Sequence, residues 1–122
     1  MYVLEHKFWI SAAHYLPKMP PQHPCHEAHG HNWEITVKVS SPVLDSCDFV
    51  MDFSALKAIC QLHVRDRFDH KFLNKVGIEN PTCENMAKLI AEIIEKYLCL
   101  PQHVLTIGVM ETQGNMCWYI PE

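Results

Sequence analysis

Asn32-Trp33-Glu34-Ile35-Thr36-Val37-Lys38-Val39-Ser40 is the stretch that decides the fold of this 122-residue chain. Large apolar side chains alternate along it with polar ones, as in a strand that buries one face and exposes the other. One-sided strands of this kind are typical of antiparallel sheets. The stretch therefore predicts a half-buried strand of an antiparallel sheet.

The residues upstream of this strand predict its partner. Residues 2–13 are rich in β-prone and aromatic side chains and indicate a first strand. Residues 15–28 contain four prolines, which is typical of a loop. We expect the two strands to pair as a hairpin, with the proline-rich loop folded over its end.

The downstream half predicts helices followed by strands. The expected elements are a short strand at 49–53, a helix from an N-cap at Ser54 to about Phe68, an irregular segment at 69–81, a helix from an N-cap at Thr82 to about Leu98, and strands at 104–110 and 116–120. Strands at both ends with helices between them indicate an α+β fold. We expect one domain over residues 1–122, with a four-stranded antiparallel sheet, two helices on one face and the order β-β-α-α-β-β.

Composition excludes several classes of function. The net charge is −4 without a basic run, which argues against nucleic-acid binding. No apolar run has the length of a membrane span, and the first residues do not resemble a secretory signal. The six cysteines form no C-x-x-C pair, so we expect free thiols and a cytoplasmic location.

The segment Cys25–Asn32 carries a candidate metal site. If the strand begins at His29, then His29 and His31 point to one face about 6–7 Å apart. Both imidazoles can then reach one metal ion. Gly30 leaves room for an ion or substrate, and Cys25 is placed to act as a base or nucleophile. The segment predicts a catalytic metal site.

A third ligand is expected from a neighbouring strand end, because catalytic zinc usually has three protein ligands and an open position. His14 follows the first strand and is preceded by the small residues Ser11, Ala12 and Ala13. From spacing alone, His14 is equally well explained as a ligand or as an ordinary strand-end histidine.

The chain resembles the 6-pyruvoyl-tetrahydropterin and 6-carboxy-tetrahydropterin synthase family over essentially its whole length. The resemblance rests on six segments in order: Ser11-Ala12-Ala13-His14, Cys25-x-x-x-His29-Gly30-His31-Asn32, Met51-Asp52-Phe53, Asp69-His70-Lys71-x-Leu73-Asn74, Pro81-Thr82-x-Glu84-Asn85 and Glu111-Thr112. Each segment is common alone, but their order and spacing together are specific. The resemblance implies the tunnelling fold and a zinc site formed by His14, His29 and His31.

The same resemblance implies catalytic roles for four further residues. Cys25 corresponds to the base that abstracts a proton, and Asp69 with His70 to the pair that completes the proton relay. Glu111 corresponds to the carboxylate that anchors the pterin, whose parallel N–H donors suit bidentate acceptance. Glu84 has a sufficient explanation as a residue of the first turn of a helix.

The gap inside the Cys25–His31 motif indicates the branch of the family. Three residues separate Cys25 from His29, as in the bacterial enzymes that form 6-carboxy-5,6,7,8-tetrahydropterin for queuosine (7-deazaguanine) biosynthesis. The implied reaction converts 7,8-dihydroneopterin triphosphate to that product, acetaldehyde and triphosphate. The alternatives are a 6-pyruvoyl-tetrahydropterin synthase, or a relative that cleaves the pterin side chain for folate synthesis, to which Glu27 points.

The resemblance also implies a homo-oligomer, a trimer or hexamer, with active sites at subunit boundaries. A four-stranded sheet with free edges agrees with this, since such edges need pairing or cover. The pterin triphosphate is the expected partner, with Lys18, Arg67, Lys71 and Lys75 as candidate phosphate contacts by charge only. Two other classes remain open, a non-catalytic pterin or metal module and a structural zinc domain.

Overall fold

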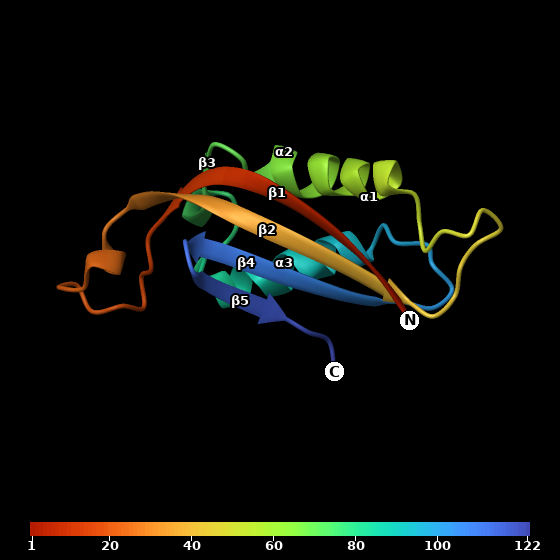
Figure 1. Cartoon of the computed structure of the whole chain (residues 1–122). Helices are drawn as coiled ribbons and strands as arrows, with labels where there is room; N and C mark the ends of the chain where they lie inside the picture. Colours follow the sequence, from red (N-terminus) through yellow and green to blue (C-terminus); the bar gives the residue numbers. More distant parts are fainter.

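The computed structural model describes all residues from 1 to 122. Its strands are β1 (Tyr2–His14), β2 (His29–Ser41), β3 (Lys71–Phe72), β4 (Val104–Thr112) and β5 (Asn115–Tyr119). They form one sheet in the order β3-β1-β2-β4-β5, and the helices cover one of its faces (Figure 1). The predicted α+β architecture is confirmed.

The predicted hairpin of the first two strands is confirmed, and its register sets the site. β1 and β2 pair antiparallel over their full lengths, with His14 opposite His29 and Ala12 opposite His31. The apolar residues of the decisive stretch are all completely buried: Trp33, Ile35, Val37 and Val39. Because side chains alternate along a strand, His29 and His31 share the face of Trp33.

The structure corrects the predicted strands in two places. A fifth strand, β3, pairs parallel with β1 inside the segment that we expected to be irregular. The predicted strand at 49–53 is wrong. The Asp45 carboxylate there accepts hydrogen bonds from the backbone N–H groups of Cys47 and Phe49, which forms a turn instead.

The first helical segment ends at Phe68 as predicted but begins earlier. Helix α1 (Phe53–Cys60) continues through a π-helical stretch (Gln61–Arg65) into the short α2 (Asp66–Phe68). Its N-cap is Asp52, whose carboxylate accepts from the Ser54 N–H at 2.8 Å, and not Ser54 itself. A carboxylate at this position satisfies a free N–H group of the first turn.

Helix α3 (Cys83–Glu95) packs against β4 and β5. The predicted N-cap is confirmed, because the Thr82 hydroxyl accepts from the Asn85 N–H at 3.1 Å. The helix ends before the predicted Leu98, although the apolar stripe runs on to that buried side chain. None of the helices has the length and apolar character needed to cross a lipid bilayer.

We expect Trp33→Ala to lower the free energy of unfolding by about 3–5 kcal/mol, the usual cost of truncating a large buried aromatic residue. Trp33 is completely buried, and its indole N–H donates to the Ala12 carbonyl at 3.2 Å. Urea denaturation of the variant and the wild type measures the difference. The matched control is Trp9→Ala, since Trp9 is 50% exposed and its loss should cost less than about 1 kcal/mol. Equal losses in the two variants would contradict the assignment of Trp33 to the core.

Candidate metal centre and active site

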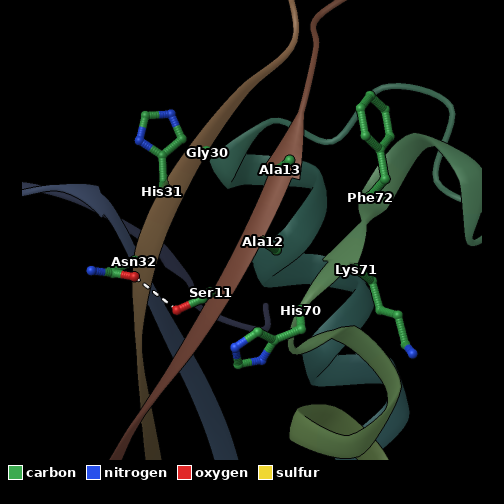
Figure 2. Close-up of a pocket in the computed structure, with 9 residues that line it drawn as sticks. All are labelled: Ser11, Ala12, Ala13, Gly30, His31, Asn32, His70, Lys71 and Phe72. Atoms are coloured by element: carbon green, nitrogen blue, oxygen red, sulfur yellow. Dashed lines mark hydrogen bonds between the residues drawn. The ribbon is translucent and has the colours of Figure 1, made fainter.

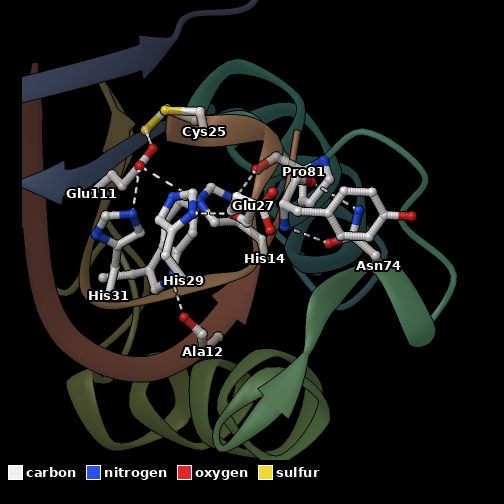
Figure 3. Close-up of polar contacts among 12 residues, drawn as sticks. Ala12, His14, Cys25, Glu27, His29, His31, Asn74, Pro81 and Glu111 are labelled. Atoms are coloured by element: carbon white, nitrogen blue, oxygen red, sulfur yellow. Dashed lines mark hydrogen bonds and ion pairs between the residues drawn. The ribbon is translucent and has the colours of Figure 1, made fainter. Parts of the chain in front are cut away.

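Three predicted ligands meet where β1 ends and β2 begins. His14 is completely buried, while His29 and His31 are partly exposed. Their rings lie edge to face with centroids 4.6–5.2 Å apart, and the Nε2 atoms of His14 and His29 are 3.0 Å apart (Figure 3). The hairpin register alone places His14 opposite His29, which explains why two segments 15 residues apart form one cluster.

Two backbone carbonyl groups fix which ring nitrogens face the cluster. The Nδ1 atom of His14 lies 2.7 Å from the Pro81 carbonyl, and that of His29 lies 2.7 Å from the Glu27 carbonyl. A carbonyl oxygen only accepts hydrogen bonds, so both Nδ1 atoms carry a proton. In the neutral rings each Nε2 atom therefore presents a lone pair, as a metal ligand does.

A fourth group, the Glu111 carboxylate, enters the cluster from β4. Its Oε1 atom lies 2.7 Å from His31 Nε2 and 3.5 Å from His14 Nε2. Its Oε2 atom accepts a hydrogen bond from the Cys83 thiol, with a separation of 3.2 Å. The four ligand atoms lie within 4.8 Å of one another.

The contact with His14 lowers the pKa of Glu111 to about 2, helped by the Cys83 thiol and the charge of His31 and opposed by burial. Burial and Glu111 together raise the pKa of Cys83 to about 12, so this thiol stays protonated and donates. Burial, with smaller contributions from His14 and His29, lowers the pKa of His31 despite the nearby carboxylate. Glu111 is thus held in its ionised form, and burial favours the neutral form of His31.

This donor set fits a divalent metal ion. The lone pairs of His14 and His29 face each other at 3.0 Å, an arrangement that a cation between them stabilises. In addition, the buried Nε2 atom of His31 has no hydrogen-bond partner. An unpartnered buried nitrogen costs free energy, and a metal bond removes that cost. The residues present therefore match a site for a divalent metal ion.

The predicted Asp69–His70 pair lies outside this cluster and is held against β1. The Asp69 carboxylate accepts from the Ser11 N–H at 2.8 Å, and His70 Nδ1 lies 2.9 Å from its other oxygen. Burial opposes ionisation of Asp69, but the hydrogen bonds from Ser11 and His70 and the charge of Arg65 lower its pKa. An ionised carboxylate is the form that orients a histidine.

His70 projects from a strained backbone position into an open pocket. Its φ angle is 60°, its N–H donates to the Ser11 carbonyl, and 80% of its side chain is exposed. The pocket has a volume of about 540 Å³ and runs across β1 between His31 and Phe72 (Figure 2). Left-handed backbone in a non-glycine residue is uncommon and concentrates at functional sites.

Cys25 lies on the loop that connects His14, at the end of β1, to His29, at the start of β2. It sits in a short 3-10 turn (Pro24–His26), and its backbone bonds to His23 and Leu16 hold it. The hydrogen bonds of His70 run to Asp69 and Ser11, so no bond joins Cys25 to His70 within one chain. The structure therefore brings the three histidines and Glu111 together, and no hydrogen bond joins Cys25 or the Asp69–His70 pair to them.

The four candidate phosphate contacts do not gather within one chain. Lys71 lines the pocket with His70, whereas Lys18 and Arg67 line two other pockets. The Lys75 ammonium lies 5.6 Å from the centre of the Phe72 ring. Their phosphate role stays a prediction.

Sequence reasoning missed the residues that position the site. The Pro81 and Glu27 carbonyl groups act through the backbone, which side-chain patterns do not reveal. The side-chain amide of Asn74 both accepts from the Tyr15 N–H and donates to the Tyr15 carbonyl at 2.9 Å, which clamps the chain just after His14. Asn74 ends one of the motifs of the resemblance, so that motif was the available signal.

Comparison with known proteins identifies the family of this chain and agrees with its fold. The family model described as 6-pyruvoyl tetrahydropterin synthase matches residues 3–122. A Synechocystis protein named 6-carboxy-5,6,7,8-tetrahydropterin synthase is 36% identical, covering 98% of this chain and 93% of its own. A dihydroneopterin monophosphate aldolase of Pyrococcus furiosus is 40% identical over 59% of this chain and 60% of its own.

Among solved structures, 6-pyruvoyl tetrahydropterin synthase of Caenorhabditis elegans superposes with a TM-score of 0.83 at 26% identity, covering 99% of this chain and 96% of that one. Sheet, helices and histidine cluster define a tunnelling-fold protein with a candidate metal centre. The chain belongs to the 6-pyruvoyl tetrahydropterin synthase family, a family of lyase-type enzymes. The predicted family and fold are confirmed.

Proposed function

We propose that the protein is a zinc-dependent 6-carboxy-5,6,7,8-tetrahydropterin synthase of queuosine biosynthesis. It would convert 7,8-dihydroneopterin triphosphate to 6-carboxytetrahydropterin, acetaldehyde and triphosphate. The observation that carries the proposal is the convergence of three histidine Nε2 atoms at the joined ends of β1 and β2 in a chain of this family. The Synechocystis relative and the three-residue gap between Cys25 and His29 support this branch.

The proposed ligands of the ion are His14, His29 and His31, each able to present Nε2 to a common point. A zinc ion bound there supplies Lewis-acid polarisation of the oxygens on the substrate side chain. His14 has the most constrained ring, since it is buried and hydrogen-bonded to the Pro81 carbonyl. Such outer contacts set the orientation of a ligand and its affinity.

The remaining residues are proposed to bind the pterin and move protons. Cys25, as a thiolate, removes a proton from the substrate side chain, since general bases act through a positioned lone pair. Asp69 fixes the tautomer of His70, which passes the proton on. Glu111 accepts the two parallel N–H donors of the pterin edge when the substrate is bound.

The product mixture tests this function directly. Purified protein loaded with zinc is supplied with 7,8-dihydroneopterin triphosphate, and the products are separated and identified by mass. Acetaldehyde released in equal amount to a carboxy-pterin supports the proposal. A pyruvoyl-pterin without acetaldehyde would assign the chain to the other synthase branch, and no turnover with metal bound would favour a binding module.

The second candidate is cleavage of the pterin side chain to a hydroxymethyl product. The similarity to the Pyrococcus aldolase favours it, together with a glutamate, Glu27, beside the histidines. Within the chain the backbone carbonyl of Glu27 accepts a hydrogen bond from the His29 ring. A hydroxymethyl-pterin in the same product assay would establish this activity.

We further propose that each active site combines two subunits of a homo-oligomer. The basis is that Cys25 and His70 share no hydrogen bond within one chain, while His70 is 80% exposed beside an open pocket. A neighbouring subunit that brings its own Cys25 to this surface would complete the proton relay.

Mixing two inactive variants tests the shared site. Cys25→Ala and His70→Ala should each be inactive, and co-refolded mixtures should regain about a quarter of wild-type activity, because one random interface in four combines intact residues from both chains. The matched control mixes Cys25→Ala with a double variant that carries both His29→Ala and His70→Ala. No intact site forms in this mixture if one subunit supplies both Cys25 and the histidine ligands. A mixture of the single variants that stays inactive while its oligomers exchange subunits would contradict the shared site.

A further inference from the structure

We propose that Glu111 is a fourth protein ligand of the metal ion while the pterin is absent, held in that position by Cys83. The incoming pterin then has to draw the carboxylate away from the ion. This inference rests on the metal site of the proposed function and adds a second position for a residue whose implied role is to anchor the pterin.

The position of the carboxylate oxygen is that of a fourth ligand. Oε1 of Glu111 lies 2.7 Å from His31 Nε2 and 3.5 Å from His14 Nε2, and the latter lies 3.0 Å from His29 Nε2. Metal–ligand bonds of about 2.0–2.2 Å in a tetrahedral site separate neighbouring ligand atoms by about 3.3–3.6 Å. Two of these separations are shorter than that range and one lies inside it, and all four ligand atoms lie within 4.8 Å of one another, so a modest adjustment places them around one ion.

The short contact between Glu111 and His31 is not a hydrogen bond. Although the two atoms are only 2.7 Å apart, His31 Nε2 is buried and has no partner in hydrogen-bonding geometry. A nitrogen and an oxygen that are this close without hydrogen-bonding geometry are compatible with two ligands of one ion. An unpartnered buried nitrogen is otherwise costly, which argues that the arrangement serves a ligand.

Cys83 determines which oxygen of Glu111 faces the histidines. The thiol donates to Oε2 at 3.2 Å, which leaves Oε1 for the cluster. Cys83 opens helix α3 immediately after the capping residue Thr82, so its backbone position is fixed by the helix start. The thiol thus supports a metal ligand from outside, as outer contacts commonly do.

The two positions of Glu111 exclude each other. Both of its oxygens are engaged in the present arrangement, one toward the histidines and one with Cys83. Bidentate acceptance of the pterin edge also requires both oxygens. A carboxylate that leaves the ion for the pterin would open a coordination position only when substrate is present, which is the state a catalytic zinc site requires.

Metal titration of Glu111→Gln provides the test. Zinc affinity is measured by competition with a chromophoric chelator, and the visible spectrum of the cobalt-substituted protein reports coordination. We expect the variant to bind zinc at least about tenfold more weakly, because removal even of supporting groups costs about 10- to 100-fold. We also expect its cobalt spectrum to differ from that of the wild type. Addition of neopterin should change the wild-type spectrum and leave that of the variant nearly unchanged.

Three further variants separate ligation from charge and from folding. Glu84→Gln removes the same charge one residue from Cys83 but outside the cluster, and it should keep wild-type zinc affinity. Cys83→Ala should bind zinc more weakly than the wild type. Cys83→Ser should bind it nearly as tightly as the wild type, since a hydroxyl can also donate to Oε2 of Glu111. Circular dichroism confirms that each variant is folded.

Unchanged zinc affinity and an unchanged cobalt spectrum in folded Glu111→Gln would overturn the fourth-ligand assignment and leave the three-histidine site intact. A wild-type protein that binds neither zinc nor cobalt would overturn the proposed zinc dependence as well.

Discussion

Cys25→Ala is expected to lower the rate of acetaldehyde release by at least about 100-fold, and by as much as about 10,000-fold, the range attributed to one general base. The zinc content should remain that of the wild type, because Cys25 is not among the four groups of the cluster. The rate is followed with an aldehyde-coupled assay at saturating substrate. The bound metal is measured by elemental analysis of the same preparations.

Two controls accompany Cys25→Ala: a variant of another thiol, and a variant that replaces the Cys25 thiol with a hydroxyl. Cys99 is exposed and distant in sequence from every site residue, so Cys99→Ala should keep full activity. Cys25→Ser should remain strongly impaired, since a hydroxyl ionises far less readily than a thiol. An active Cys25→Ala enzyme would remove Cys25 from the proton relay and point to another base in the loop, of which Glu27 is the nearest carboxylate in sequence.

The fold was predictable where local pattern and tertiary burial agree. The alternation from Asn32 to Ser40 predicted a one-faced strand, and the sheet buries that face under α3 and α1. The Thr82 cap was predictable for the same reason, since a side chain caps its own helix through a local hydrogen bond. Local chemistry of this kind is present in the sequence itself.

The fold was not predictable where distant segments decide the structure. β3 contains two residues, and it is a strand only because β1 offers it a parallel partner at Ala12 and Ala13. The error at residues 49–53 is the opposite one, since a strand was predicted there and none forms. Their apolar side chains suited a strand, but the Asp45 carboxylate bonded to the backbone there and formed a turn.

In the candidate site, too, local features were predictable and features that depend on distant segments were not. His29 and His31 lie two apart in one strand, so their common face was predictable from spacing. His14 remained undecided until pairing placed it opposite His29. The contact between Glu111 and the histidines joins β4 to the β1–β2 hairpin, and no spacing in the sequence encodes it. The resemblance alone had marked Glu111, and with a different role.

His14→Asn is expected to abolish detectable turnover and to lower zinc occupancy sharply. His14 contributes one of the three converging Nε2 atoms, and its removal leaves two histidines and one carboxylate. Asparagine can place its side-chain N–H near the Pro81 carbonyl, where the His14 ring donates now. The variant therefore removes the ligand atom and keeps the buried hydrogen bond. Elemental analysis measures the occupancy, and the product assay measures the turnover.

Thermal unfolding with and without added zinc separates a lost ligand from a damaged fold. An ion that binds only the folded state raises its stability by about 2.7 kcal/mol at a concentration 100 times the dissociation constant. We expect zinc to raise the Tm of the metal-free wild type and of His63→Ala, whose ring stacks on Tyr97 away from the cluster. The Tm of metal-free His14→Asn should hardly respond to zinc. If zinc stabilises this variant as much as the wild type, the ion binds without His14, and this histidine is a buried structural residue at the end of β1.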